Sequence, residues 1–167
     1  KNTGINIGKS VCDDGYKDLV GKILEKSKTH NCKIYYPLDV VVSKEFNGNG
    51  TIKEINKVNN DEMILDIGPK TIKSIKNIVD NSNTILWNGP AGYFENPNFA
   101  NGTKKILEII ANRRFKDKIY AVAGGGETVA VINKFNKINS FNFVSTAGGA
   151  FLEYLEGKEL PGIMALN

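Results

Sequence analysis

The sequence has few of the residue types that most often build a site by themselves, with two cysteines and one histidine among 167 residues. Cys12 and Cys32 stand in neither a CxxC pair nor the spacing of metal ligands, so we interpret both as reduced thiols without a metal. A catalytic triad built on histidine is excluded as well. The single histidine, His30, follows an expected helix at its polar end and is interpreted as a surface residue.

Long apolar runs and dense charge are also missing. No stretch approaches the roughly 18 apolar residues of a membrane-spanning helix, and the opening "KNTGINIGKS" lacks the hydrophobic core of a signal peptide. The net charge is +4 from 22 basic and 18 acidic residues, but the lysines are scattered among acids and asparagines. Phosphate-backbone binders concentrate their charge, so neither a nucleic acid nor a membrane is an expected partner. We expect a cytoplasmic protein.

A regular alternation of apolar runs and helical patterns fills the second half of the chain. With 41% hydrophobic residues the chain is long enough for one domain with its own core. The strands are expected at 63–68, 84–87, 118–123 and 141–146, and the helices at 69–81, around 106–110, up to 135 and at 151–158. The strands at 84–87, 118–123 and 141–146 are each followed by a loop and a helix. These three successive strand–loop–helix units predict an α/β fold, a parallel sheet with helices on both faces.

The first part of the chain is less regular. Apolar residues from Tyr16 to Leu24 recur at helical spacing and predict an amphipathic helix. "KIYYPLDVVV" at 33–42 predicts extended backbone, and Pro37 within it indicates an edge or a strand end. The polar stretch 46–60 indicates a small hairpin, and we expect no function there.

Glycine-bearing loops follow three of the predicted strands, on the sheet edge where open α/β sheets bind ligands. Gly124, Gly125 and Gly126 have no Cβ, so backbone N–H groups can approach an anion in front of a helix expected to begin near Thr128. "STAGGAF" repeats this arrangement before a helix expected at Phe151. Two adjacent anion cradles are suited to a polyphosphate, or to a phosphate that is passed between two places.

Two carboxylates accompany these loops. Glu127 repels phosphate itself, but a carboxylate in a phosphate pocket is a suitable Mg²⁺ ligand. Alternatively, it only favours its helix N-terminus. Glu95 in "GYFE" lies where it could accept hydrogen bonds from ribose hydroxyls. Neither GxxxxGK[ST] nor the GxGxxG of a dinucleotide fold is present, which disfavours hydride transfer.

Longer motifs now show a family resemblance. "TILWNGPAGYFE", "AVAGGGETVAVI" and "FNFVSTAGGAFLEYLEGKELPGIMAL" resemble successive signatures of the carboxyl-terminal half of phosphoglycerate kinases. "YYPLDVVVSKEF" and "ILDIGPKT" match the same family in the same order, so the resemblance covers the entire chain, residues 1–167. It implies phosphoryl transfer between 1,3-bisphosphoglycerate and MgADP, giving 3-phosphoglycerate and ATP in glycolysis. It also implies a full-length protein that is a monomer.

The resemblance assigns roles to particular residues. Asn88 and Gly89 would lie beside the nucleotide phosphates, and Glu95 would bind the ribose hydroxyls. The phosphates and Mg²⁺ would be held by the turn formed by Gly124, Gly125, Gly126, Glu127 and Thr128. Gly148 and Gly149 would face the phosphoryl group in transfer. Leu65 and Phe46 would line the adenine slot, or alternatively serve as ordinary core residues.

Three departures from the family pattern are visible. Glu127 replaces the usual Asp, and its extra methylene raises the question of direct or water-mediated Mg²⁺ coordination. Ala147 replaces a glycine, which we expect to be tolerated if its φ is negative. By comparison with the family, we expect the substrate-binding lobe, the first two strands of the carboxyl-terminal domain and the basic residues that neutralise the transferring group to lie outside these 167 residues.

These absences lead to two expectations. Without the two central strands of a 3-2-1-4-5-6 sheet, the "KIYYP" strand would be detached from the other three. We also expect no measurable kinase activity from the 167 residues alone. Two interpretations stay open at this point: the nucleotide-binding part of a phosphoglycerate kinase, or a non-catalytic remnant that binds another phosphate ligand or serves as a partner surface.

Overall fold

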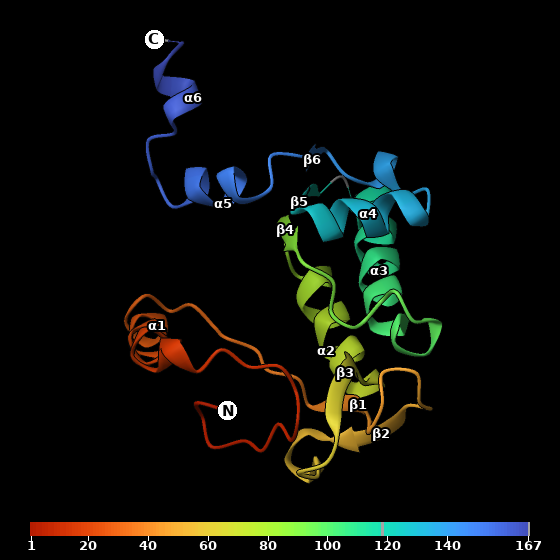
Figure 1. Ribbon diagram of the computed structural model, residues 1–167. Helices are drawn as coiled ribbons and strands as arrows, with labels where there is room; N and C mark the ends of the chain where they lie inside the picture. The colour runs from red at the N-terminus through yellow and green to blue at the C-terminus, as the bar shows by residue number, and fades with distance from the viewer. Residues whose placement is uncertain (118, 167) are drawn as a thin grey trace.

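The computed structural model describes residues 1–117 and 119–166, which form two separate three-stranded sheets with helices (Figure 1). The strands are β1 (Asp39–Ser43), β2 (Thr51–Glu54), β3 (Met63–Ile67), β4 (Thr84–Asn88), β5 (Tyr120–Gly124) and β6 (Phe143–Ser145). The α-helices are α1 (Lys17–Thr29), α2 (Pro69–Asp80), α3 (Asn101–Asp117), α4 (Gly126–Lys134), α5 (Gly149–Leu155) and α6 (Pro161–Met164). Short 3-10 turns are η1 (Asp14–Tyr16), η2 (Ile55–Lys57), η3 (Pro97–Phe99) and η4 (Ile138–Ser140).

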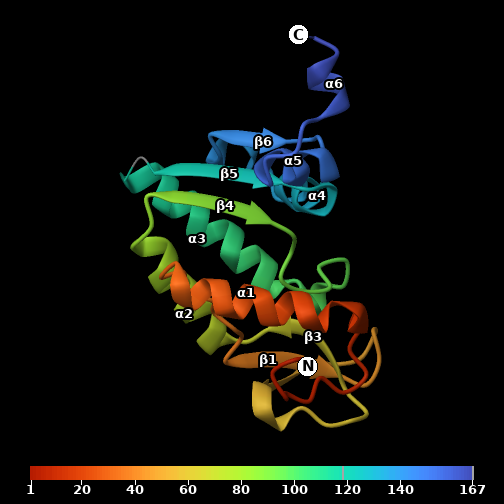
Figure 2. The ribbon, with the colours of Figure 1, turned by 90° about the vertical axis from the view of Figure 1, so that its left-hand side faces the viewer.

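The predicted parallel sheet is present, with the strand order β4-β5-β6. Thr84 lies opposite Tyr120 and Asn88 opposite Gly124, so β4 and β5 end at the same level. Figure 2 shows the three arrows pointing the same way, with α4 and α5 beside their tips. The α/β prediction is confirmed. Lys118, the first residue of the strand expected at 118–123, lies outside the described residues.

One face of this sheet carries the larger core. Trp87 and Ala123 on the strands pack with Leu107 of α3 and Val131 of α4, and each of these side chains is at most 7% exposed. The Trp87 ring stacks on Phe141, with ring centroids 6.1 Å apart. The apolar periodicity expected around 106–110 therefore describes a real helix face.

The opposite face is covered less fully. A Cβ on Gly124 would lie 2.4 Å from the ring of Phe151, so α5 approaches this face at the strand end. Farther along, Leu86, Tyr120 and Phe143 are 47%, 53% and 53% exposed. Helices thus flank both faces of the sheet, but unequally.

The other sheet is antiparallel, with the order β2-β1-β3. β1 and β2 form a small hairpin, of which the polar stretch 46–60 supplies β2 and part of the turn, while β1 precedes that stretch. The strand expected at 33–42 begins only at Asp39, so the prediction for 33–38 was wrong. Pro37 has no N–H for a ladder, and Tyr35 and Tyr36 are about half exposed. The detached "KIYYP" strand that was expected is therefore not present, because residues 33–37 form no strand.

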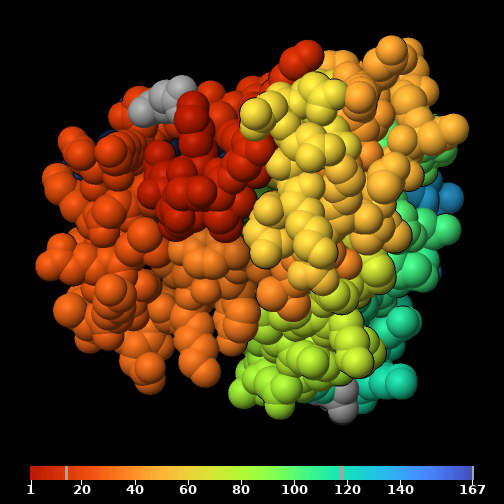
Figure 3. Space-filling view, turned by 90° about the horizontal axis from the view of Figure 1, so that it is seen from below, coloured from red at the N-terminus to blue at the C-terminus, as the bar shows by residue number. Residues whose placement is uncertain are grey.

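Helix α1 forms as its apolar periodicity predicted, but it packs weakly. It has no buried residue, and Leu19 and Ile23 of its apolar stripe are 50% and 47% exposed. Seen from below, the red segment preceding α1 lies beside the yellow segment between β2 and β3 (Figure 3), where the Lys9 N–H donates to the Glu62 carbonyl at 2.7 Å. Within the described residues, this stripe is not covered by another element.

The first turn of α2 is capped by a buried carboxylate from β1. Asp39 is 2% exposed, and its carboxylate accepts hydrogen bonds from the backbone N–H groups of Lys70 (3.0 Å) and Thr71 (2.8 Å). The Thr71 hydroxyl donates to the same carboxylate at 2.8 Å. Pro69 opens the helix, where no N–H is needed. A Cβ on Gly68 would lie 2.3 Å from the Asp39 carboxyl carbon, so glycine allows the close approach.

We predict that Asp39→Ala lowers the free energy of unfolding by about 1–2 kcal/mol at pH 7, because the helix loses its cap. Burial acts to raise the pKa of Asp39, but the Lys70 and Thr71 donors outweigh it and hold the pKa below its usual value. The stabilisation is therefore complete above the unfolded pKa of about 3.9 and is lost as the pH falls through the lower folded pKa. Urea unfolding at pH 7 and at pH 3 measures the change, with exposed Asp80→Ala as the control; an equal loss at both pH values would contradict the prediction.

None of the helices within residues 1–117 and 119–166 combines the length and apolar character that crossing a bilayer requires.

Candidate functional site

Three loops at the carboxyl ends of the parallel strands enclose one pocket of about 290 Å³. Each loop follows one of the strands β4, β5 and β6. The pocket is lined by Asn88, Gly89, Gly125, Gly126, Glu127, Thr128, Gly148, Gly149 and Leu152. Eight of these nine residues belong to the set predicted from the sequence, and Leu152 is the addition.

The first two loops are joined by a hydrogen bond and by a close backbone approach. The backbone N–H of Gly89 donates to the Thr128 hydroxyl oxygen at 2.7 Å. Gly125 has φ 91° and ψ 139°, and a Cβ there would lie 2.7 Å from Asn88 Oδ1. Only glycine adopts this conformation without strain, so the turn requires bare backbone at this position.

Helix α4 begins at Gly126, two residues before the expected start. Its first backbone bond runs from the Val129 N–H to the Gly125 carbonyl, so the N–H groups of Gly126, Glu127 and Thr128 precede the helical ladder. Such N–H groups and the positive end of the helix dipole favour a bound anion. The structure thus has the geometry of an anion cradle at this loop.

Glu127 is exposed in the first turn of α4, on the wall of the pocket. Among the described residues, no cluster of three or more His, Cys, Asp or Glu side chains is placed to hold a metal ion. One carboxylate is nevertheless a sufficient protein ligand for Mg²⁺ when phosphate oxygens and waters supply the rest. The donor set fits a nucleotide-bound Mg²⁺ better than a metal held by protein alone.

The third loop, after β6, contributes two glycines to the pocket lining, and the space beside them is open. Gly148 has φ 56° and ψ −127°, and a Cβ on Gly148 or Gly149 would meet no atom within 4 Å. Helix α5 begins at Gly149, again two residues earlier than expected. Leu152 was missed because it was treated as part of the helix interior, although its position one turn after Gly149 was visible in the sequence.

Gly124 does not reach the pocket wall. It is the last residue of β5, it is buried, and the space in place of its side chain accommodates the Phe151 ring. The structure therefore gives this glycine a packing role between β5 and α5, in place of the anion contact expected for it.

The remaining predicted residues lie outside the glycine pocket. Glu95 is exposed in the loop after β4 and does not line the pocket. Leu65 on β3 is 7% exposed, while Phe46 after β1 is 49% exposed. Phe46 meets Tyr93 edge to face, with ring centroids 5.5 Å apart, and the Tyr93 N–H donates to the Leu65 carbonyl at 2.8 Å. These contacts gather an apolar region around Tyr93, which sequence reasoning did not select.

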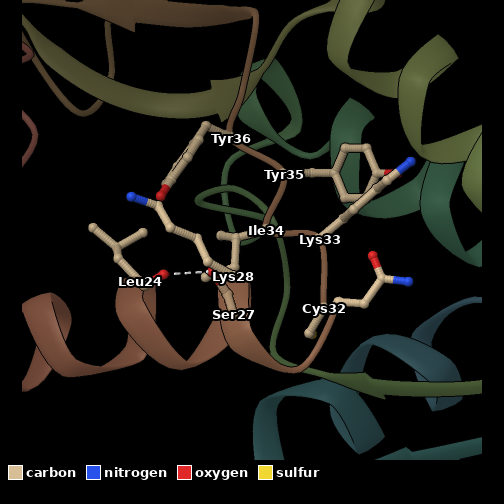
Figure 4. Close-up of a pocket in the computed structure, with 9 residues that line it drawn as sticks. Leu24, Ser27, Lys28, Cys32, Lys33, Ile34, Tyr35 and Tyr36 are labelled. Carbon is tan, nitrogen blue, oxygen red and sulfur yellow. Dashed lines mark hydrogen bonds between the residues drawn. The ribbon is translucent and has the colours of Figure 1, made fainter.

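A hollow of about 460 Å³, larger than the glycine pocket, lies between α1 and the segment after it. Figure 4 shows Leu24, Ile34 and Tyr36 among its lining side chains, with the Ser27 hydroxyl bonded to the Leu24 carbonyl. It contains none of the residues predicted to bind a ligand. Its volume alone therefore does not make it the candidate site.

Glycine turns at the carboxyl ends of parallel strands, with a helix N-terminus facing a shared pocket, define an α/β domain with the geometry of an anion-binding pocket. The particular family follows from comparison with known proteins. The family model for phosphoglycerate kinase matches residues 1–158, and the chain belongs to the phosphoglycerate kinase family.

Individual relatives agree with this assignment. A phosphoglycerate kinase of Zymomonas mobilis is 46% identical over 166 residues, and one of Francisella philomiragia is 47% identical over 172 residues. These alignments cover 98% and 100% of this chain, but 42% of each relative. The solved phosphoglycerate kinase of Coxiella burnetii superposes with a TM-score of 0.90 at 39% identity, covering 99% of this chain and 42% of that one. The chain thus spans about two-fifths of the length of these relatives.

Proposed function

We propose that the chain is the nucleotide-binding, carboxyl-terminal domain of a phosphoglycerate kinase. In this proposal the glycine pocket binds the phosphates of ADP or ATP during phosphoryl exchange between 1,3-bisphosphoglycerate and ADP. The observation that carries it is the meeting of Asn88, Gly125 and Gly149, from three separate loops, around one pocket. Membership of the family supports the choice of a nucleotide over another polyphosphate.

The proposal gives each part of the nucleotide its own surroundings. The phosphates lie against the N–H groups at the start of α4, and the ribose hydroxyls donate to Glu95. The adenine occupies the apolar region that includes Leu65 and Phe46, where Phe46 is 49% exposed and so accessible to a ring. Phosphoryl transfer then depends on alignment and on neutralisation of charge, which backbone donors supply without moving.

Mg²⁺ would be held by Glu127 together with nucleotide phosphate oxygens. When bound, it would supply positive charge that neutralises the phosphates. The Glu127 side chain is exposed on the pocket wall, and its length allows it to reach toward a ligand held at the helix N-terminus. Its own contribution is to orient the metal-bearing nucleotide.

The phosphoglycerate substrate is proposed to bind to parts of a longer protein. Among the described lining residues of the glycine pocket, Glu127 is the single charged side chain, so the lining supplies no cationic group for the transferring phosphoryl. We therefore expect the 167-residue chain to bind nucleotide without measurable turnover. For the whole protein we propose a cytoplasmic monomer.

The test is calorimetric titration of the purified chain with ADP, with and without Mg²⁺. We predict Mg²⁺-dependent binding that Glu127→Gln weakens by about tenfold, since the amide keeps the shape of the side chain but loses the metal-binding charge. Glu25→Gln on α1 is the matched control, because that residue is exposed and lies outside the pocket.

The outcomes separate two parts of the proposal. If the affinity for ADP depends neither on Mg²⁺ nor on Glu127→Gln, the proposed metal-binding role of Glu127 is contradicted, while the proposed nucleotide binding by the pocket is retained. An absence of ADP binding by a chain whose circular dichroism shows folded α/β structure would contradict the nucleotide role itself.

A further inference from the structure

The loop between β4 and α3 connects two proposed contacts of the nucleotide. It begins at Gly89, beside the phosphate pocket, and reaches Glu95, the proposed ribose acceptor. Gly89 is fixed by its hydrogen bond to the Thr128 hydroxyl. The distance between the phosphate and ribose contacts therefore depends on what holds the middle of the loop.

A buried hydroxyl on α3 holds the middle of this loop. Thr103 is 0% exposed, and its Oγ1 accepts hydrogen bonds from the backbone N–H groups of Ala91 (3.0 Å) and Gly92 (3.2 Å). The next N–H, of Tyr93, donates to the Leu65 carbonyl at 2.8 Å. Three consecutive loop donors are thus bonded, two of them to one side-chain oxygen.

A buried carboxylate supports the same junction from behind. Asp66 is 1% exposed, and it accepts hydrogen bonds from the Gly102 N–H at 2.7 Å and from the Ile67 N–H at 2.8 Å. Burial raises the pKa of this carboxyl. A Cβ on Gly92 would lie 2.4 Å from Asp66 Oδ1, so the loop backbone rests directly on the carboxylate. The loop is therefore bonded to α3 and packed against β3.

We propose that Thr103 is a positioning residue that sets Glu95 at the correct distance from the phosphate pocket. This inference rests on the proposed nucleotide function. Thr103 touches no part of the proposed nucleotide site, since it is fully buried on α3 and does not line the pocket. It acts through the loop backbone, and its loss affects the ribose end of the ligand more than the phosphate end.

The test compares Thr103→Val with Thr103→Ser. Valine keeps the shape but removes the acceptor of two loop donors, whereas serine keeps the hydroxyl. MgADP, 2′,3′-dideoxy-ADP with Mg²⁺, and inorganic pyrophosphate are titrated into each variant. We expect valine to weaken ADP binding by about tenfold and to abolish the preference for ADP over the dideoxy analogue, because a misplaced Glu95 no longer meets the hydroxyls. The affinity of the valine variant for pyrophosphate should match that of the wild type. The serine variant should match the wild type in its affinity for all three ligands.

Thr71→Val is the matched control, since it removes another buried threonine hydroxyl. Thr71 lies on α2 and bonds to Asp39 of the antiparallel sheet. It should lower stability without changing the preference for ADP. The inference is overturned if Thr103→Val keeps that preference, or if it weakens pyrophosphate binding as much as ADP binding.

Amide hydrogen exchange supplies a readout that needs no ligand. Thr103→Val should accelerate exchange at Ala91 and Gly92 by about tenfold relative to the amides of β5. Unchanged exchange at these two amides would overturn the inference even if ADP binding fell. If the wild-type chain binds no ADP, the proposed function fails, while the exchange rates still decide whether Thr103 holds the loop.

Discussion

Gly125→Ala is expected to lower the affinity of the chain for MgADP by about 100-fold, because it displaces the backbone on which two of the three loops meet. At φ 91° and ψ 139° an alanine is strained by about 1–3 kcal/mol, so the turn relaxes toward another conformation. If it does not relax, the new Cβ lies 2.7 Å from Asn88 Oδ1 and displaces that side chain from the pocket wall. Either response misplaces the backbone donors that we propose to bind the phosphates.

Gly126→Ala is the control for this substitution. Gly126 lies in the same turn and lines the same pocket, but its φ is not positive and a Cβ there meets no atom within 4 Å. Calorimetric titration with MgADP should show a loss well below that of Gly125→Ala, with circular dichroism confirming that both variants fold. Equal losses would show that any side chain in the turn blocks the ligand and that the conformation of Gly125 is not the cause.

The parallel sheet and its loops were predictable because their signals are local. Each strand of this sheet is an apolar run followed by a glycine turn and a helical pattern, so short windows suffice. Asn88, Glu127 and Gly149 then meet because parallel strands end on one edge. The helix starts were predicted less accurately. α4 and α5 begin at glycines, two residues before the expected starts, because glycine is typical both of a turn and of the first position of these helices.

The contacts between distant segments were not predictable in this way. "KIYY" has the composition of a strand, yet β-propensity expresses packing against neighbours, and this segment has no paired strand in the structure. Gly124 carries the same sequence signal as Gly125, and only the position of Phe151 distinguishes packing from anion contact. Thr103 and Asp66 have no motif, since their importance comes from hydrogen bonds to residues 10 or more positions away.

Phe99→Ala is expected to lower the free energy of unfolding by about 3–5 kcal/mol, the range for removing a fully buried phenylalanine ring. Phe99 is 0% exposed and lies in η3, between β4 and α3. A Cβ on Gly50, in the β1–β2 hairpin, would lie 3.1 Å from the Phe99 ring, so the ring packs where the hairpin meets the loop before α3. Its removal leaves a cavity between the antiparallel sheet and the loop that connects β4 to α3.

The loss expected for Phe99→Ala corresponds to a fall in Tm of about 6–20 °C for a chain of this size. Calorimetric melting measures it, and Phe115→Ala is the control, because Phe115 on α3 is 68% exposed and its truncation should change Tm little. Since Phe99 and the Thr103 contacts both secure the loop between β4 and α3, the cavity should also speed amide exchange at Gly92 before the chain melts. A small Tm change equal to that of Phe115→Ala would mean that the hairpin and the loop are held together by other contacts, and that the two sheets are coupled independently of this ring.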